Sequence, residues 1–166
     1  PSSGGAAHRS IARTVGKAPD GWYCRYAPSL NTRRLVAEHG GYTYDCDAYN
    51  DDVPYWTEAA GKAHLVVPYS LVTNDAKFLS GGLVSGRAFG ESLIEACEVL
   101  RAESKSVARM MSVGMHPRII GQPGRIHALE LFLDYLAGQN DVWVCRRNDL
   151  AAHWRSVMPA RDRESA

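Results

Sequence analysis

Residues 21–47 read GWYCRYAPSLNTRRLVAEHGGYTYDCD, and this stretch decides the fold because it holds two strands and the helix that joins them. The short aromatic run Gly21–Arg25 predicts a strand. Leu30–His39 predicts a helix, which the pair Gly40-Gly41 ends. Tyr42–Asp47 predicts a second strand with charge at its end. A strand–helix–strand unit of this kind favours parallel strands in one sheet.

The same alternation continues along the rest of the chain. Further strands are expected at three short apolar runs, His64–Ser70, Arg109–His116 and Val142–Arg147. Further helices are expected at Phe89–Glu103, in a segment that opens at Pro123 or Gly124, and from Asp149 to about Val157. Strands that alternate with helices predict an α/β fold with a mostly parallel sheet.

The ends of the chain differ in composition from its middle. Residues 1–10 are predicted to be a flexible linker, because Pro, Ser, Gly and Ala fill the first seven positions. Residues 159–166 are predicted to be a polar tail, which leaves 11–158 as the folded part. The chain does not begin with Met, so we expect it to be part of a longer protein. The long connections Asp47–Lys62 and Leu71–Ala88 are candidates for functional loops.

The composition excludes several classes of protein. The chain has 166 residues, of which 45% are hydrophobic and 22% are charged, and its net charge is +1. These values exclude a disordered chain, a collagen-like repeat and a coiled coil. They give no reason to expect nucleic acid or an anionic membrane as a partner. No apolar run approaches the roughly 20 residues that a membrane helix needs.

The cysteines and histidines offer no metal site within this chain. The four cysteines form no Cys-x-x-Cys pair, and the six histidines form no His-x-His or His-x-x-x-His pair. We therefore expect reduced, buried thiols in a cytoplasmic protein, and no metal ligands among these residues.

Polar and ionisable side chains follow the expected strands, whereas the strand bodies are apolar. In parallel α/β folds the active site lies beyond the carboxyl ends of the strands. The candidate site residues are therefore those just after each strand: Arg25, Asp45, Asp47, Tyr49, Tyr69, Asn74, His116, Arg118 and Arg146.

His116 ends the apolar run MMSVGM and precedes Pro117. An imidazole at a strand end can act as a general acid or base, because its pKa lies near working pH. A histidine that caps a helix and bonds to a carbonyl explains the same position equally well. The position alone leaves both interpretations open.

The run YDCDAYNDD at Tyr44–Asp52 holds four carboxylates in eight residues, Asp45 to Asp52. Asp45 and Asp47 point to the same face of a strand, and a nearby cation, such as Arg25, would be needed to offset their repulsion. A calcium loop is the rival functional interpretation, but the Gly and the closing Glu of the EF-hand pattern are missing. A solvated acidic loop explains Asp51 and Asp52 better than it explains Asp45.

Four runs, read in order, resemble the carboxyl-terminal half of the polysaccharide deacetylase (NodB-like) superfamily. They are residues 21–56, HLVVPYSLVTND, MMSVGMHPRIIGQPGR and VWVCRRNDLAAHW. The resemblance extends from about Ile11 to Pro159 and is greatest for the cofactor-independent allantoinase and chitin deacetylase-like branch. It implies a partial (β/α) barrel with its site at the carboxyl ends of mostly parallel strands.

The resemblance also assigns roles to individual residues. The family's arginine motif matches Arg25, its acidic motif matches Asp45 and Asp47 with Tyr49 near the aromatic position, and its Leu-x-His motif, which supplies the general acid, matches His116. The catalytic base and the metal ligands of the metal-dependent deacetylases lie upstream of these runs. The acidic motif here is Asp-Cys-Asp and not Asp-x-x-Asp-Trp, which favours the allantoinase-like branch.

The implied chemistry is hydrolysis of a non-peptide carbon–nitrogen bond. The first expectation is ring opening of allantoin to allantoate without a cofactor. The alternative is N-deacetylation of chitin or another N-acetylated polysaccharide, with a divalent metal such as zinc held by upstream residues. A third interpretation is an inactive fragment that acts as an assembly or binding module. The resemblance also implies a homo-oligomer.

Roles follow for the remaining candidates. His116 would protonate the departing nitrogen, and Asp45 would hold Arg25 or His116 in place. Arg118 or Arg146 would bind an anionic ureide or stabilise the oxyanion. Asp47, Tyr49, Tyr69 and Asn74 complete the expected substrate-binding set.

Overall fold

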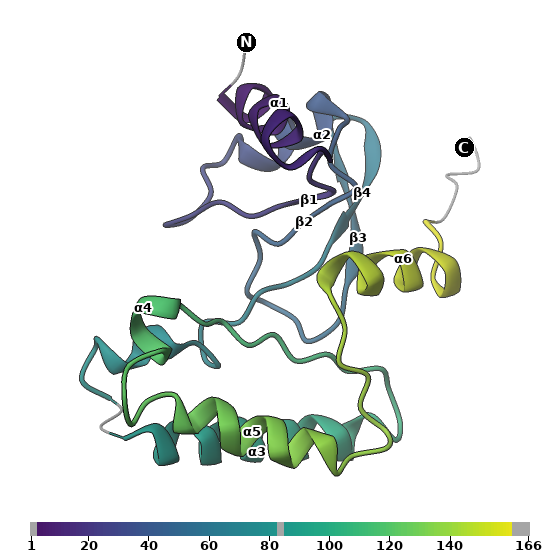
Figure 1. The fold of residues 1–166 in the computed structure, drawn as a ribbon. Coiled ribbons are helices and arrows are strands. Elements are labelled where there is room, and N and C mark those ends of the chain that lie inside the picture. The colour runs from purple at the N-terminus through teal and green to yellow at the C-terminus, as the bar shows by residue number, and fades with distance from the viewer. Residues whose placement is uncertain (1–2, 83–84, 161–166) are drawn as a thin grey trace. The chain divides into compact units, whose positions relative to one another are not determined.

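The computed structural model describes residues 3–82 and 85–160, which form two compact units (Figure 1). The first, which we call the sheet unit, contains the described residues up to Tyr69 and those from Cys145 onward. The second, which we call the helical unit, is Ser70–Val144. Each is described by itself.

The described part of the sheet unit contains a 4-stranded sheet in the order β1-β2-β4-β3. The strands are β1 (Gly21–Trp22), β2 (Tyr44–Asp45), β3 (Tyr55–Ala59) and β4 (Lys62–Val66). β1, β2 and β4 run parallel, and β3 pairs antiparallel with β4. The mostly parallel sheet confirms the α/β class expected from the sequence.

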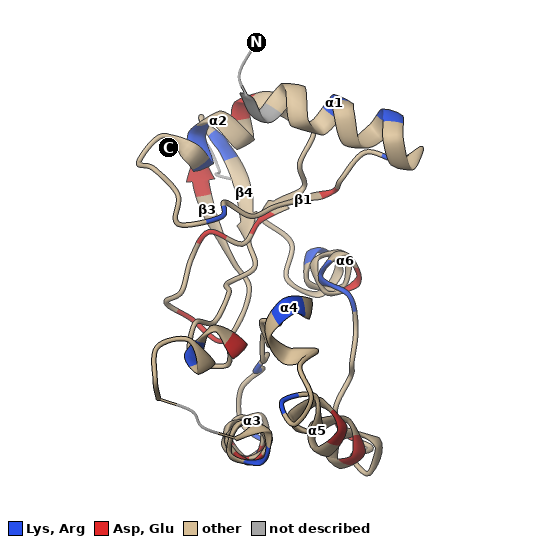
Figure 2. Cartoon of the chain, turned by 60° about the vertical axis from the view of Figure 1, so that its left-hand side comes forward, with Lys and Arg blue, Asp and Glu red and all other residues tan. Residues whose placement is uncertain are grey.

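Three helices flank this sheet: α1 (Ser3–Val15), α2 (Thr32–His39) and α6 (Arg147–Val157). α2 ends at Gly40, whose φ of 71° is a conformation that glycine adopts without steric penalty. α1 carries Arg9 and Arg13 and no acidic residue (Figure 2). Because β1, β2 and β4 are parallel, their carboxyl ends, at Trp22, Asp45 and Val66, meet at one edge of the sheet.

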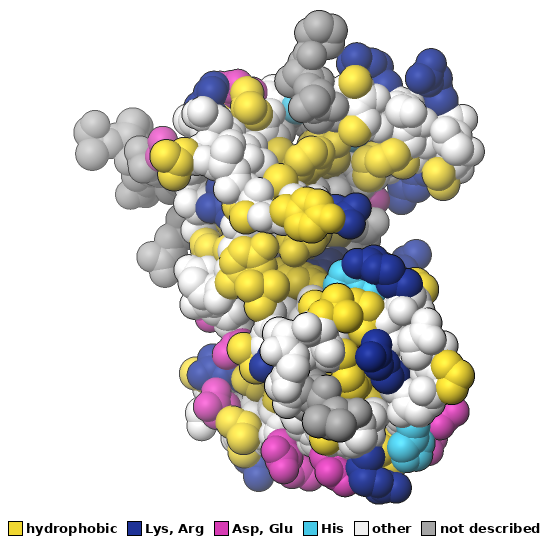
Figure 3. Space-filling model, turned by 90° about the vertical axis from the view of Figure 1, so that its left-hand side faces the viewer, with side chains coloured by type: hydrophobic (Ala, Val, Ile, Leu, Met, Phe, Trp, Pro, Cys, Tyr) yellow, Lys and Arg dark blue, Asp and Glu magenta, His cyan; other side chains and the backbone are white. Residues whose placement is uncertain are grey.

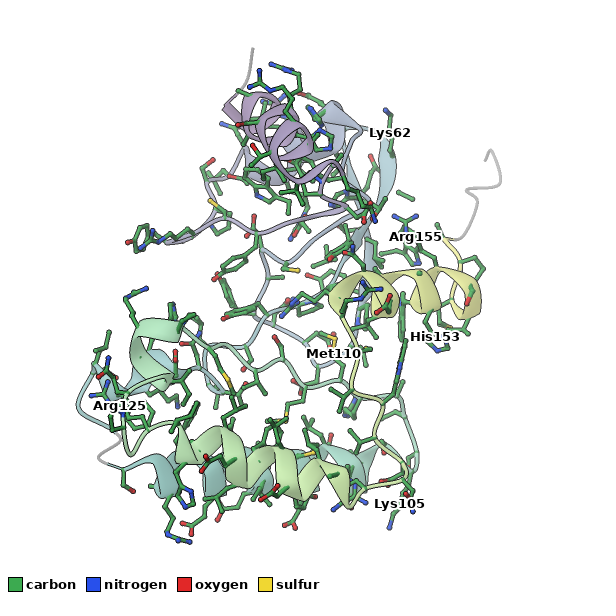
Figure 4. All side chains as sticks on the ribbon, in the orientation of Figure 1. Lys62, Lys105, Met110, Arg125, His153 and Arg155 are labelled. Atoms are coloured by element: carbon green, nitrogen blue, oxygen red, sulfur yellow. The ribbon has the colours of Figure 1, made fainter. Side chains whose placement is uncertain are left out.

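Polar side chains fasten α6 to the sheet. The hydroxyl of Tyr44 donates a hydrogen bond to Asn148 Oδ1 at 2.7 Å. The indole of Trp56 donates to the carbonyl of Met158 at 2.7 Å. Arg155, labelled in Figure 4, lies with its guanidinium 4.9 Å from the centroid of the Trp56 ring and also donates to the Thr43 carbonyl.

The helical unit is built on two long helices, α3 (Gly86–Glu103) and α5 (His127–Ala137), with the shorter α4 (Pro117–Ile120) and η1 (Asp75–Phe78). Its core consists of Phe78, Phe89, Leu93, Cys97, Ile119, Ile120, Ala128 and Phe132. Arg125, also labelled in Figure 4, places its guanidinium 4.9 Å from the centroid of the Phe78 ring. Ser85 caps the start of α3, because its hydroxyl accepts a hydrogen bond from the Ala88 N–H.

Several boundaries expected from the sequence are wrong. The linker at residues 1–10 is helical over the part that the structure describes, because α1 begins at Ser3. The connection Asp47–Lys62 contains β3, which turns into β4 through Ala60 and Gly61, both at positive φ. A turn with two positive φ angles suits a tight hairpin, and the Ala-Gly pair is a weak sequence signal for it.

Two of the expected strands are also wrong. Within the described residues, Arg109–His116 forms a single isolated bridge, between Gly114 and Asn74, and Val142–Arg147 forms no ladder before α6 begins. The reason is that an apolar run of this length becomes a strand only when a partner strand satisfies its backbone. No described helix is both long and apolar enough to cross a membrane.

The close packing in the helical unit makes a test of the fold. A Cβ added at Gly86 would lie 2.1 Å from the carbonyl oxygen of Gly124. Backbone cannot yield as a flexible side chain can, so Gly86→Ala is expected to lower the free energy of unfolding by about 1–3 kcal/mol. Urea denaturation of the intact protein measures the change.

The matched control is Gly138→Ala, whose added Cβ would meet the Tyr135 carbonyl at an ordinary 3.5 Å. That variant is expected to unfold at nearly the wild-type urea concentration. Equal midpoints for the two variants would contradict the packing described for the start of α3.

Candidate active site

Asp75 and His116 form a tightly bonded pair in the helical unit. Asp75 has 0% of its surface exposed. The backbone N–H of His116 donates to Asp75 Oδ2 at 2.7 Å, and the ring nitrogen Nδ1 lies 2.6 Å from Oδ1. A carboxylate acceptor at this distance places the proton on Nδ1, so Nε2 is the ring nitrogen left for a ligand. The His116 side chain is 36% exposed, which allows such contact.

Backbone bonds around Asn74 bring the two residues together. The Asp75 N–H donates to the Gly114 carbonyl at 3.0 Å, and the Gly114 N–H donates to the Thr73 carbonyl at 2.9 Å. Asn74 Oδ1 accepts from the Ala76 N–H at 2.8 Å and so caps η1. Asn74, expected to bind substrate, thus has a structural role that the sequence analysis did not anticipate.

The carboxylate that bonds to His116 belongs to Asp75. The expectation that Asp45 would hold His116 is therefore wrong. Asp75 was not among the predicted site residues, although it follows the third expected strand. An Asp after Asn at the start of a short helix reads equally well as a capping residue, so only its contacts separate the two roles.

Asp45 lies instead at the centre of a buried network in the sheet unit. Arg33, from α2, donates to its two carboxylate oxygens at 2.7 and 3.1 Å. His64 Nε2 lies 2.9 Å from Oδ2, and the Asp47 N–H donates to Oδ1 at 2.9 Å. Burial alone would raise the pKa of Asp45, but the hydrogen bonds from His64 and Arg33 outweigh it and lower the pKa to about 2.

The cation that balances Asp45 is Arg33, so the expected pairing with Arg25 is wrong. The Arg25 guanidinium lies 4.4 Å from the centroid of the Tyr26 ring. The chain leaves β1 through Tyr26 and Ala27, both at positive φ, whereas Arg33 sits on the helix that returns over the sheet. Helix α2 therefore directs the Arg33 side chain toward Asp45, whereas the loop after β1 holds Arg25 against the Tyr26 ring. The predicted catalytic role of Arg25 stays a prediction.

Asp47 lies close to Asp45 but in a different environment. Its Oδ1 accepts from the Cys24 N–H at 2.7 Å. Its Oδ2 is buried and has no hydrogen-bond partner among the described residues, and the same holds for the nearby Trp22 Nε1. Burial raises the pKa of Asp47 above its usual value, and the charge of Asp45 adds to this, against the backbone N–H of Cys24. The pKa of Asp45 is thus lowered and the pKa of Asp47 is raised, although the two residues are neighbours.

Tyrosines at three strand ends gather beside Asp47. The hydroxyls of Tyr23 and Tyr49 lie 3.4 Å apart, and the rings of Tyr23 and Tyr69 have centroids 4.9 Å apart. The Arg147 guanidinium lies 5.2 Å from the Tyr69 ring centroid. The structure thus brings together two predicted residues, Tyr49 and Tyr69, with Tyr23 and Arg147, which the sequence analysis did not select.

The last two predicted arginines make other contacts. Arg146 forms an exposed ion pair with Asp149 at 2.8 Å. Arg118 lies exposed on α4, two residues after His116. Neither the ion pair of Arg146 nor the exposed position of Arg118 tests a role in substrate binding, so both roles stay predictions.

The described residues do not form a metal centre. Among them, no three His, Cys, Asp or Glu side chains come together in a way that could hold a metal ion. Asp45 and His64 form one acidic–histidine pair, and there Arg33 already supplies the balancing positive charge. The described residues of this chain therefore do not by themselves provide the ligands of a metal site.

No family model matches the sequence. A Schizosaccharomyces pombe protein named "Putative polysaccharide deacetylase" is 34% identical over 158 residues, which cover 86% of this chain and 49% of that protein. The chain spans about half the length of this relative.

Solved structures with deacetylase and allantoinase names are also similar to this chain. Puue allantoinase is 43% identical with a TM-score of 0.88, over 94% of this chain and 52% of that one. A "probable Polysaccharide deacetylase" from Pseudomonas aeruginosa is 42% identical with a TM-score of 0.88, over 94% and 53%. A Mycobacterium smegmatis protein, 24% identical with a TM-score of 0.70 over 90% and 54%, shares the fold.

The mostly parallel α/β fold is thus that of the NodB-type deacetylases, as the sequence predicted. By sequence and by structure, the chain is a homologue of the polysaccharide deacetylases, with an allantoinase among its structural neighbours.

The Asp45 network predicts how stability depends on pH. Because its pKa is lowered from 3.8 to about 2 in the folded protein, ionised Asp45 stabilises the fold by about 2 kcal/mol above pH 4. That contribution is lost as the pH falls from 4 towards 2. Asp45→Asn should therefore be less stable than wild type at pH 6, with the difference shrinking below pH 4, as urea denaturation at several pH values will show.

Asp149→Asn is the matched control, because Asp149 forms an ion pair on the surface. It is expected to unfold at nearly the wild-type urea concentration at pH 6, because an exposed ion pair contributes little to stability. A wild-type advantage over Asp45→Asn that persists undiminished at pH 2 would contradict the ionised network.

Proposed function

We propose that the protein hydrolyses a carbon–nitrogen amide bond and that His116 is its general acid. The observation that carries the proposal is the buried Asp75, which bonds both to the backbone and to the ring of His116. The relatives span about twice the length of this chain, so the proposal concerns the intact protein.

The chemistry explains why such a pair is useful. In amide hydrolysis, water oxygen bonds to the carbonyl carbon, the carbon–nitrogen bond breaks, and the departing nitrogen takes up a proton. The imidazolium form of His116, fixed through its Nδ1–H, presents its Nε2–H in a constant direction, so it can deliver that proton and is left as the neutral imidazole. The proton that the attacking water loses goes to a general base, which we expect outside this chain. Asp75 is then a positioning residue that selects the tautomer and stabilises the imidazolium, as the carboxylate of a catalytic triad does.

A cyclic ureide such as allantoin is the first choice of substrate, with ring opening to allantoate as the reaction. The likeness to Puue allantoinase over 94% of the chain supports this choice. The Asp-Cys-Asp run supports it as well, because it lacks the Asp-x-x-Asp-Trp pattern of metal-dependent deacetylases.

Removal of acetyl groups from an N-acetylated polysaccharide is the second candidate. It is favoured by the likeness to the Schizosaccharomyces pombe protein and to the Pseudomonas aeruginosa structure, both named for that chemistry. The described residues supply no metal centre for it, so any metal would need ligands from elsewhere in the intact protein.

His116→Ala in the intact protein is expected to lower kcat by about 10²–10⁴-fold, the usual contribution of a general acid. Asp75→Asn is expected to lower kcat as well and to shift the pH profile of kcat/KM, because an amide favours the wrong tautomer. Steady-state kinetics across a pH series measures both effects, and circular dichroism checks the fold of each variant.

The matched control is His127→Ala, which removes an exposed histidine that pairs with Glu130 within α5. Its kcat should equal that of wild type. A wild-type kcat in His116→Ala would remove His116 from the mechanism, and an unchanged pH profile in Asp75→Asn would reduce Asp75 to a purely structural residue.

The substrate is decided by assaying the intact protein with allantoin and with an N-acetylated chitin oligomer, each with and without a chelator. We expect ring opening of allantoin at a rate that the chelator does not change. Release of acetate that the chelator abolishes would establish the deacetylase alternative in its place.

A further inference from the structure

Thr73 closes one end of the short pairing that brings Asp75 to His116. Among the described residues, two main-chain hydrogen bonds join the two segments. The Gly114 N–H donates to the Thr73 carbonyl at 2.9 Å, and the Asp75 N–H donates to the Gly114 carbonyl at 3.0 Å. These bonds make the single parallel bridge between Asn74 and Gly114. One bridge fixes the register of two segments weakly, because few bonds are lost when the segments slip.

Side chains replace the next main-chain bond at each end of this bridge. A longer parallel ladder would join the Thr73 N–H to the Ser112 carbonyl. The Thr73 hydroxyl makes that bond in its place, at 2.5 Å. At the other end, the ladder would join the His116 N–H to the Asp75 carbonyl. The Asp75 carboxylate accepts that bond instead, at 2.7 Å. The bridge is thus extended at both ends by side chains.

The turn before Thr73 explains why its hydroxyl takes the place of its N–H. The Ser70 hydroxyl oxygen accepts from the N–H groups of Val72 and Thr73, at 3.2 and 3.4 Å. A local bond of this kind competes with a ladder for the same donor. The Thr73 N–H is therefore used within its own segment, and the hydroxyl supplies the donor for the Ser112 carbonyl.

Thr73 is buried, whereas the imidazole at the other end of the pairing is accessible. Thr73 is 7% exposed and Asp75 is 0% exposed. The His116 side chain is 36% exposed, and histidine side chains reach the surface on the face drawn in Figure 3. An effect of Thr73 on the reaction is therefore expected to pass through Asp75 and His116, and not through contact with a substrate.

We infer that Thr73 is a positioning residue for the general acid, because its hydroxyl fixes the register in which Asp75 meets His116. Of the two side chains that extend the bridge, Asp75 belongs to the catalytic pair itself, so Thr73 is the one that can hold the register independently of the pair. Misplacement of a reacting group by about 1 Å can lower a rate by about 100-fold. The inference rests on the proposed function, in which His116 is the general acid.

The test compares Thr73→Val with Thr73→Ser in the intact protein. Valine has nearly the shape of threonine but no hydroxyl, whereas serine keeps the hydroxyl and loses the methyl group. Thr73→Val is expected to lower kcat at least about 5-fold with KM nearly unchanged, which is the effect of about one hydrogen bond. Thr73→Ser is expected to keep kcat within about 2-fold of wild type. Steady-state kinetics measures both values.

A second measurement needs no turnover. The proton on His116 Nδ1, which lies 2.6 Å from Asp75 Oδ1, should give a proton NMR signal downfield of the backbone amides. Its absence in His116→Ala assigns the signal. The signal should shift or broaden in Thr73→Val and keep its wild-type position in Thr73→Ser, because only valine removes the bond that fixes the register. A purely structural role of Thr73 would lower the free energy of unfolding without moving the signal.

Thr43→Val is the matched control, because the Thr43 hydroxyl also donates to the backbone carbonyl of a residue distant in sequence, Asp20, at 3.0 Å. Its kcat and its His116 signal should equal those of wild type. If Thr73→Val does not fold, Thr73→Cys takes its place. A thiol is a weaker donor than the hydroxyl of Thr73→Ser and extends the side chain by the same number of atoms. The kcat of Thr73→Cys should therefore be below that of Thr73→Ser.

Three outcomes would overturn the inference: a wild-type kcat in folded Thr73→Val, a lowered kcat with an unmoved His116 signal, or a Thr73→Ser variant that behaves as Thr73→Val or Thr73→Cys does. The NMR signal separates this result from the proposed function. A signal that moves in Thr73→Val, in a protein that hydrolyses no carbon–nitrogen bond, would keep the positioning role and reject the reaction. Turnover that depends on His116 but not on Thr73 would do the reverse.

Discussion

A carboxylate that is removed from water must be paired, and this constraint organises both units of the chain. Asp45 meets it with Arg33, His64 and a backbone N–H, so it is a fixed structural charge. Asp75 meets it through the backbone and the ring of His116, so the residue that satisfies the carboxylate is also oriented by it. Asp47 meets it only in part. The three residues differ in role because they differ in how far their charge is satisfied.

The fold supplies these environments through short pieces of regular structure. β1 and β2 are two residues each in length, yet their ends position the loops that carry Tyr23 and Asp47. The hairpin of β3 and β4 brings His64 beneath Asp45. In the helical unit, a single bridge between Asn74 and Gly114 aligns Asp75 with His116. A few backbone hydrogen bonds thus place groups that are 41 residues apart in the chain at 2.6 Å.

Sequence reasoning succeeded where the signal is local. The helix that ends at Gly40 and the mostly parallel sheet both follow from patterns within a few positions. The roles of the selected site residues stay predictions. Sequence reasoning failed where the secondary structure of a segment depends on the segments that pack against it. Residues 109–116 and 142–147 have strand-like composition, but a strand needs a neighbour, and residues 3–10 are helical despite their Gly and Ser.

By itself, the sequence determined the fold class, the order of the elements in residues 21–47 and the kinds of side chain that collect after the strands, because hydrophobic periodicity and turn residues act over short distances. Only the tertiary structure decided which charges pair. It chose Arg33 over Arg25 for Asp45 and Asp75 over Asp45 for His116, and it left one oxygen of Asp47 unpartnered among the described residues. Hydrogen bonds and ion pairs act only over a few ångströms, and which groups come within that range depends on how distant segments of the chain pack.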